Sequence, residues 1–183
     1  MNITVLTFEG RTVVRPDTTR IKDNEDAWLP DGSEGCLWTP VIYTRLDKSG
    51  KSIAREFAGR YFSSVNAGIL IYPRSCIDGS AEGYASACCI DHTSALRLQF
   101  TDGIPETAVL GVEADGKECF RASIDPGAVI AGAISETSRG TLLRLGDIVA
   151  AELSSPSVIV GPAPAHFKGH LDDFDSFDFI IHY

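Results

Sequence analysis

Apolar and polar residues alternate over short stretches along most of the chain, and this period of two is typical of β-strands. Turn residues separate the stretches, as at Glu9-Gly10 and Asp115-Gly116. Helical spacing is confined to residues 52–61, where Ser52 could cap the first turn, and residues 126–138. The predicted strands are residues 2–8, 11–14, 41–46, 67–72, 95–100, 108–114 and 118–122, one within 142–151 and two within 169–182. We therefore expect a mixed β (α+β) fold, one domain over residues 1–183, with one or two helices.

Length and charge narrow the class of protein. A chain of 183 residues fits one domain with a core of its own. Its net charge of −9 argues against a nucleic-acid partner, which would require clustered Lys and Arg. No apolar run approaches the length that spans a bilayer, and residues 1–10 lack the pattern of a signal peptide. We expect a cytoplasmic protein with no membrane partner.

Five cysteines, at positions 36, 76, 88, 89 and 119, have neither an even number nor a C-x-x-C spacing. Adjacent Cys88 and Cys89 are poorly placed to pair with each other, since neighbouring side chains diverge in regular structure. Zinc sites need paired ligands at turn spacing, which this set lacks. We expect reduced, buried, small apolar cysteines.

Residues 47–75 read DKSGKSIAREFAGRYFSSVNAGILIYPRS. This stretch resembles the signature segment of the fumarylacetoacetate hydrolase (FAH) superfamily, GKNIxExFAHRYYxxIxxGIDFTARD in bacterial members. Further blocks resemble that family in the same order: VRPDT at 14–18, the Gly116-Lys117 hairpin, TLLRLGDIV at 141–149 and the closing strands at 167–181. The resemblance covers most of the chain and implies the β-rich FAH C-terminal-domain fold, here N-terminally shortened.

The resemblance also implies a chemistry, because family members cleave or decarboxylate acylpyruvate-type acids with Mg²⁺ or Mn²⁺ held by three carboxylates. Aligned on the signature, those three positions fall on Thr39, Val41 and Leu70. Hard cations need oxygen ligands, so this set should hold no metal. The catalytic histidine is missing from residues 1–13, and the T-G-T-P substrate loop has become AELSSP at 151–156.

The sequence therefore predicts a pseudoenzyme with a binding or structural role and no cofactor, because a fold can persist without its chemistry. The alternative is an active FAH-family enzyme, a C–C bond hydrolase or decarboxylase of oxo acids. Its Mg²⁺ or Mn²⁺ would then be held by displaced ligands such as Glu34, Asp47 or Glu152. The resemblance further implies a homodimer.

Three residues are candidates for chemistry of another kind. Cys88 and His92 bring a thiol and an imidazole close in sequence, as a Cys/His nucleophilic centre would require, although such pairs usually come from separate segments. Buried thiols beside a loop histidine are the other interpretation. Arg74 matches the arginine of the family's A-R-D motif, and it could clamp a small carboxylate ligand or pair structurally with Asp78 or Glu56.

Two further clusters suit metals less well. His166 and His170 would share a helical face, but Gly169 and nearby prolines favour surface histidines in a loop and strand. The acidic C-terminal stretch around Asp172 lacks the glycine turn and closing glutamate of a calcium loop. Alternating strand faces explain it.

Overall fold

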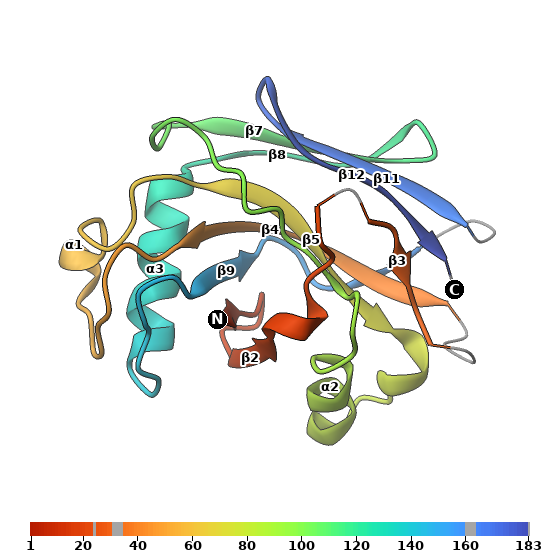
Figure 1. Ribbon diagram of the computed structural model, residues 1–183, viewed down its shortest axis with the longest axis horizontal. Helices are drawn as coiled ribbons and strands as arrows, with labels where there is room; N and C mark the ends of the chain where they lie inside the picture. Colours follow the sequence, from red (N-terminus) through yellow and green to blue (C-terminus); the bar gives the residue numbers. More distant parts are fainter. Residues whose placement is uncertain (24, 31–34, 160–163, 183) are drawn as a thin grey trace.

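The computed structural model describes residues 1–23, 25–30, 35–159 and 164–182, which form two β-sheets and their covering helices (Figure 1). The larger sheet runs in the order β2 (Thr12–Pro16), β1 (Asn2–Leu6), β9 (Ile148–Glu152), β4 (Cys36–Arg45), β5 (Asn66–Pro73), β6 (Ser94–Ala95), with β10 (Ser157–Val158) also paired to β4. The smaller sheet runs β3 (Ala27–Trp28), β12 (Phe174–His182), β11 (Ala165–Leu171), β7 (Ala108–Ala114), β8 (Lys117–Ile124). The expected strand-rich α+β fold is confirmed.

Helix α3 (Pro126–Ser138) forms over the residues that the sequence predicted. The Asp125 side chain accepts a hydrogen bond from the Ala128 backbone N–H at 2.8 Å, and Pro126 occupies the first turn, where its missing N–H is harmless. The helix packs on β9, β1 and β4 of the larger sheet. No helix in the described part of the chain is long and apolar enough to span a membrane.

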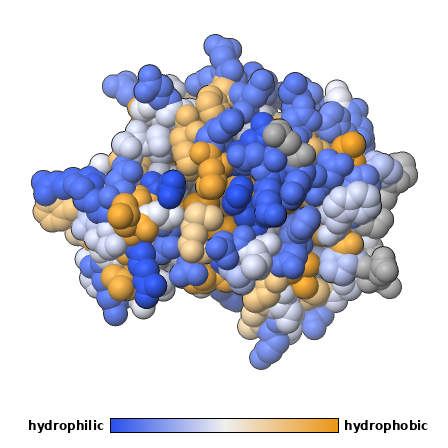
Figure 2. Space-filling view, in the orientation of Figure 1, coloured by the Kyte–Doolittle hydropathy of each residue, from blue (hydrophilic) through white to orange (hydrophobic). Residues whose placement is uncertain are grey.

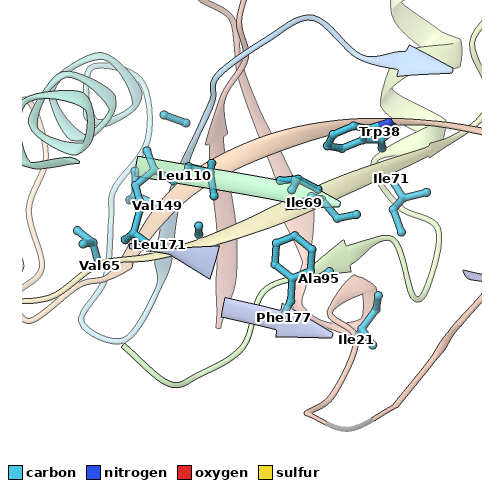
Figure 3. Packing of buried hydrophobic residues seen from close by; sticks show 14 of the residues in the cluster. Ile21, Trp38, Val65, Ile69, Ile71, Ala95, Leu110, Val149, Leu171 and Phe177 are labelled. Carbon is cyan, nitrogen blue, oxygen red and sulfur yellow. The ribbon is translucent and has the colours of Figure 1, made fainter. Parts of the chain in front are cut away.

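The larger sheet is buried on both faces. On one face, side chains such as Ile69, Ile71 and Val149 pack against α3 and against Leu110, Leu171 and Phe177, all three of which come from the smaller sheet (Figure 3). The opposite face carries a second apolar cluster. Its members come from β1, β4, β5, β9, the end of helix α2 (Ala81–Ala87) and the residue after β6: Ile3, Val5, Val41, Tyr43, Leu70, Tyr72, Ala87, Cys88, Leu96, Ile148 and Ala150. Alternation along each strand assigns successive residues to the two faces.

The predicted helix over residues 52–61 is wrong in extent, because only one turn forms, α1 (Arg55–Ala58). Ser52 has a positive φ of 52°, and its N–H donates to the Ser138 carbonyl at 2.8 Å. The Ile53 N–H donates to the Ser138 hydroxyl at 2.9 Å. The end of α3 thus binds this segment in a non-helical form, and Ser52 is not a cap.

Helix α2 was not predicted, and neither were the short 3₁₀ turns η1 (Asp17–Thr19) and η2 (Arg74–Cys76) or strand β3. Helix α2 is short and rich in small residues, so its apolar periodicity is weak. The Ser80 hydroxyl caps it, accepting from the Gly83 N–H at 2.9 Å.

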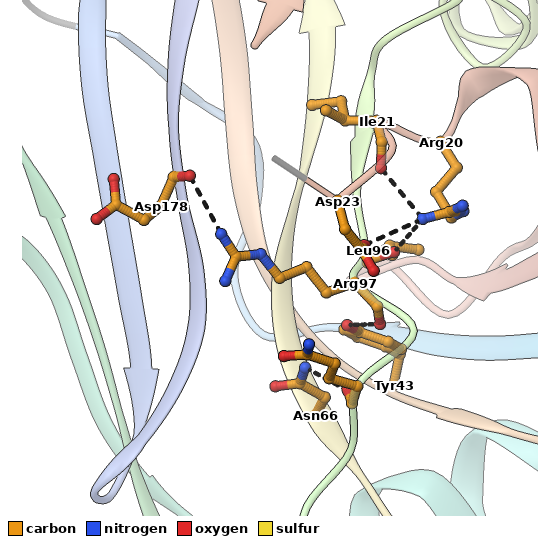
Figure 4. A network of polar contacts seen from close by, with 9 residues as sticks. Arg20, Ile21, Asp23, Tyr43, Asn66, Leu96, Arg97 and Asp178 are labelled. Carbon is orange, nitrogen blue, oxygen red and sulfur yellow. Dashed lines mark hydrogen bonds and ion pairs between the residues drawn. The ribbon is translucent and has the colours of Figure 1, made fainter. Parts of the chain in front are cut away.

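The strand predicted over residues 95–100 is reduced to β6 (Ser94–Ala95). In residues 96–100, side chains of the larger sheet donate hydrogen bonds to backbone carbonyls that would otherwise accept from a neighbouring strand. The Tyr43 hydroxyl donates to the Arg97 carbonyl at 2.6 Å, and the Asn66 amide donates to the Gln99 carbonyl at 2.8 Å. Arg97 in turn donates to the Asp178 carbonyl at 3.3 Å, which ties this segment to the smaller sheet (Figure 4).

Candidate functional site

The three positions that the FAH resemblance assigns to metal ligands lie on one face of the larger sheet. Thr39 and Val41 are two apart on β4, and Thr39 lies opposite Leu70 of β5 in the antiparallel register. Partners in register and residues two apart share a face. The face is that of the second apolar cluster, in which Val41 and Leu70 are fully buried.

These three side chains do not fit Mg²⁺ or Mn²⁺. The Thr39 hydroxyl is already committed, since it donates to the Ser154 carbonyl at 2.6 Å. Val41 and Leu70 offer no oxygen, and hard divalent cations require several oxygen ligands. Within the described residues no group of three or more His, Cys, Asp or Glu side chains is placed to hold a metal ion.

A carboxylate does lie beside these positions. Glu152 ends β9 directly opposite Val41, so its side chain is on the same sheet face, and the residue is only 7% exposed. Three donors contact it. Tyr72 and Tyr84 donate through their hydroxyls to Oε1, Tyr84 at 3.4 Å, and the Phe8 backbone N–H donates to Oε2 at 2.9 Å. The Tyr84 hydroxyl also lies 3.0 Å from that of Tyr72.

Behind Tyr72 lies a fully buried arginine. The guanidinium of Arg15, on β2, is 4.5 Å from the centroid of the Tyr72 ring. Its NH1 donates to the Thr93 carbonyl and hydroxyl at 3.0 and 3.1 Å, and its NH2 donates to the Ile71 carbonyl at 3.3 Å. Tyr72 thus contacts a buried cation through its ring and the buried carboxylate of Glu152 through its hydroxyl.

Burial dominates the ionisation of this group. Desolvation raises the pKa of Glu152 above its usual value, although the hydrogen bond from Tyr72, the Phe8 N–H and the positive charge of Arg15 act in the opposite direction. Desolvation also raises the pKa values of Tyr72 and Tyr84, and the Glu152 charge adds to both shifts. Both tyrosines therefore keep their protons and remain hydrogen-bond donors.

Glu152 and Tyr84 line a cavity of about 370 Å³. Three segments form its walls: the turn between β1 and β2, the start of α2 with the residues before it, and the chain after β9. The lining residues are Thr7, Phe8, Glu9, Arg11, Ile77, Gly79, Ser80, Ala81, Tyr84, Glu152, Ser155 and Pro156. The cavity is thus partly apolar, with a buried carboxylate and several hydroxyls.

The candidate nucleophile pair is not brought together. Cys88 is buried in the second apolar cluster at the end of α2, and burial raises the pKa of its thiol. His92 has a positive φ of 59° and borders a separate hollow with Asp17 and Arg20. Its Nδ1 is buried with no hydrogen-bond partner among the described residues, so the thiol does not bind there.

Other charged candidates lie at the surface. Arg74 is exposed on η2, and it forms no ion pair with Asp78 or Glu56, all three of which are described. Asp47 is exposed on the loop after β4, and Glu34 lies outside the described residues. Of the two candidates that the structure describes, Asp47 and Glu152, only Glu152 lines the cavity.

The two histidine and aspartate clusters belong to the smaller sheet. His166 and His170 both lie on β11, which begins four residues before the expected strand, so His166 is not in a loop. His166 Nε2 is 2.6 Å from the Asp178 carboxylate on β12. Asp172 is in the turn between these strands with a φ of 50°. All five cysteines are free, as expected, but the expected burial holds only for Cys36 and Cys88, since Cys76 is half-buried and Cys89 and Cys119 are exposed.

Comparison with solved structures assigns the fold. The chain matches fumarylpyruvate hydrolase from Pseudomonas aeruginosa, solved with Mn²⁺ and pyruvate, at a TM-score of 0.85 and 14% identity, over 100% of this chain and 89% of that one. It matches 5-carboxymethyl-2-hydroxymuconate delta-isomerase from Mycobacterium smegmatis at 0.84 and 13% identity, over 99% and 78%. A protein from Yersinia pestis CO92 described as of the fumarylacetoacetate hydrolase family matches at 0.78 and 13% identity, over 98% and 92%.

The protein therefore has the fold of the FAH-family proteins, and the resemblance noted in the sequence is confirmed at the level of fold. No protein-family model and no curated protein matches the sequence. Sequence reasoning considered Glu152 only as a displaced ligand, and it missed Tyr72, Tyr84 and the burial of Arg15. The sequence offered little indication of these residues: Arg15 belongs to the VRPDT block of the family resemblance, but nothing in that block indicates that its side chain is buried.

Proposed function

We propose that this protein is an FAH-fold pseudoenzyme, which has lost the divalent-metal site and serves a binding or structural role. One observation carries the proposal: the side chains at the family's three ligand positions are Thr39, Val41 and Leu70, and each is engaged in packing or in a hydrogen bond to the protein itself. Recovering a metal site would require carboxylates at positions such as Val41 and Leu70, which are fully buried in an apolar cluster.

A second candidate function has one observation in its favour. Glu152 supplies a buried carboxylate to the same sheet face, next to Val41, and it borders the cavity. An FAH-family enzyme with displaced ligands, acting on C–C bonds of acylpyruvate or other oxo acids, would use this carboxylate to hold Mg²⁺ or Mn²⁺. One carboxylate falls short of the usual ligand number for either cation, so we prefer the first proposal.

Thermal unfolding with millimolar Mg²⁺ or Mn²⁺, and then with added oxalate, separates the two. A ligand at 100 times its dissociation constant adds about 2.7 kcal/mol to the native state, which raises the midpoint by several degrees. We expect no shift with either metal. A metal-dependent shift that grows with oxalate, and that disappears in Glu152→Gln, would establish the second candidate instead.

Two further proposals follow the family pattern. A homodimer is supported by large apolar side chains at the surface, among them Trp28 at 62% and Leu145 at 67% exposure, and one face shows a hydrophobic band among hydrophilic residues (Figure 2). Sedimentation equilibrium tests the homodimer.

A small carboxylate ligand at Arg74 is supported by the exposure of that guanidinium, and the Arg74→Ala variant should no longer bind such a ligand.

A further inference from the structure

We propose that the cavity beside Glu152 binds a small, uncharged organic molecule that donates a hydroxyl hydrogen bond to the Glu152 carboxylate. The inference rests on the proposed absence of a divalent metal, because a bound cation would occupy the same carboxylate. The cavity is the one that Glu152 and Tyr84 line.

The hydrogen-bond inventory of Glu152 defines what a ligand must offer. A carboxylate has about four acceptor sites on its two oxygens. Tyr72 donates to Oε1, Tyr84 shares its single hydroxyl proton between Oε1 at 3.4 Å and the Tyr72 hydroxyl at 3.0 Å, and the Phe8 N–H uses one site on Oε2. One acceptor site on Oε2 is left, and Glu152 lines the cavity. A ligand must therefore donate a hydrogen bond there.

Charge favours a neutral donor. Tyr72 contacts both buried charged groups, the Arg15 guanidinium and the Glu152 carboxylate, and their opposite charges sum to zero. A cationic ligand would add an uncompensated charge to a desolvated site, which is unfavourable. An anionic ligand would be repelled by the negative charge of the Glu152 carboxylate. At the mouth of the cavity, the Glu9 carboxylate and the Arg11 guanidinium lie 4.0 Å apart, and their opposite charges offset each other.

The walls favour a partly apolar molecule. Phe8, Ile77 and Pro156 line the cavity together with the Ser80 and Ser155 hydroxyls. A volume of about 370 Å³ is in the lower range of small-molecule sites, which combine apolar walls with a few placed polar groups. A small aromatic alcohol has these properties.

Four probes that share a benzene ring test the ligand class by titration with ligand-observed NMR. Benzyl alcohol and anisole are isomers, but only the alcohol donates a hydrogen bond, while benzylamine is a cation and benzoate an anion. We expect benzyl alcohol to bind about tenfold more tightly than anisole or better, as one hydrogen bond to a charged carboxylate would give, and more tightly than both ions. Equal binding of the isomers, tightest binding of either ion, or no binding of any probe would overturn the proposal.

Two variants locate the binding. Glu152→Gln should remove most of the preference for benzyl alcohol over anisole. Ala81→Leu, at an exposed position of the cavity wall, should weaken all probes severalfold without changing the melting temperature, because its side chain fills the cavity and does not touch Glu152. Unchanged affinity in Ala81→Leu would overturn the proposal even if Glu152→Gln failed to fold.

The same titrations in EDTA and in Mn²⁺ separate this inference from the proposed function. A Mn²⁺-dependent thermal shift, with the alcohol preference intact in EDTA, would contradict the metal-free function alone. Absence of the preference in EDTA, with no Mn²⁺ shift, would contradict the ligand class alone.

Discussion

The guanidinium of Arg15 stacks over the ring of Tyr72, 4.5 Å from its centroid, on the side of β5 that faces away from α3. The hydroxyl of the same ring donates to Glu152, so one tyrosine contacts both a buried cation and a buried carboxylate. Neither charge reaches solvent to any large extent. Arg15, Tyr72 and Glu152 therefore stabilise one another, and removing one side chain should weaken the interactions of the other two.

Removal of the Arg15 side chain should be strongly destabilising. Arg15→Ala deletes several buried hydrogen bonds and leaves Glu152 without a balancing charge, which should lower the free energy of unfolding by about 3–5 kcal/mol in urea denaturation. Arg11→Ala is the matched control, since that side chain is 74% exposed, and its effect should stay within about 0.5 kcal/mol. A loss below about 1 kcal/mol in Arg15→Ala would contradict the buried network.

The stability of the protein should carry a pH dependence from Glu152. Burial raises the pKa of this carboxyl in the native state above its ordinary value of 4.5, so the native state binds more protons than the unfolded state. The resulting stabilisation is complete below pH 4.5 and is lost as the pH rises through the native pKa. Wild type should therefore lose stability relative to Glu152→Gln across that interval, measured by urea denaturation at a series of pH values. A difference that stays flat or grows with pH would contradict the raised pKa.

Alkylation should distinguish the two adjacent cysteines. Iodoacetamide at neutral pH should label exposed Cys89 in the native protein and leave buried Cys88 intact until unfolding, because burial raises the thiol pKa of Cys88 and blocks access. Tandem mass spectrometry of the shared peptide locates the label, and Cys89→Ser should stay unlabelled at this peptide. Fast native labelling of Cys88 would favour a cysteine nucleophile.

Leu70 should behave as a core residue rather than as a metal-ligand position. Leu70→Ala should cost about 2–5 kcal/mol of unfolding free energy through the cavity it leaves. Leu70→Asp should cost more at neutral pH, because it buries an unpaired charge beside Val41 and Tyr72. Mn²⁺ should not restore its melting temperature. A Mn²⁺-dependent recovery would show that neighbouring groups still form a cation site.

The elements that the sequence predicted well are those whose pattern is local. Helix α3 has a capping aspartate and Pro126 at its start, and the β7–β8 hairpin turns at Asp115-Gly116, which both adopt positive φ as a tight hairpin requires. Gly68 of the signature segment shows a further constraint: a Cβ there would approach the Ala95 carbonyl oxygen to 2.4 Å. The helix predicted over residues 52–61 is wrong at its start because the backbone N–H groups of Ser52 and Ile53 bind the distant Ser138.

The sequence by itself determined the strand-rich fold and the resemblance to the FAH family, and it has non-carboxylate residues at Thr39, Val41 and Leu70, where that resemblance places metal ligands. Residue types and their spacing are properties of the chain alone. Tertiary structure alone decided that Arg15, Tyr72, Tyr84 and Glu152 meet. They come from β2, β5, α2 and β9, and the pairing of β9 with β4 is what places Glu152 beside Val41. Burial then changes the ionisation of these groups, and burial depends on neighbours that are far away in the sequence.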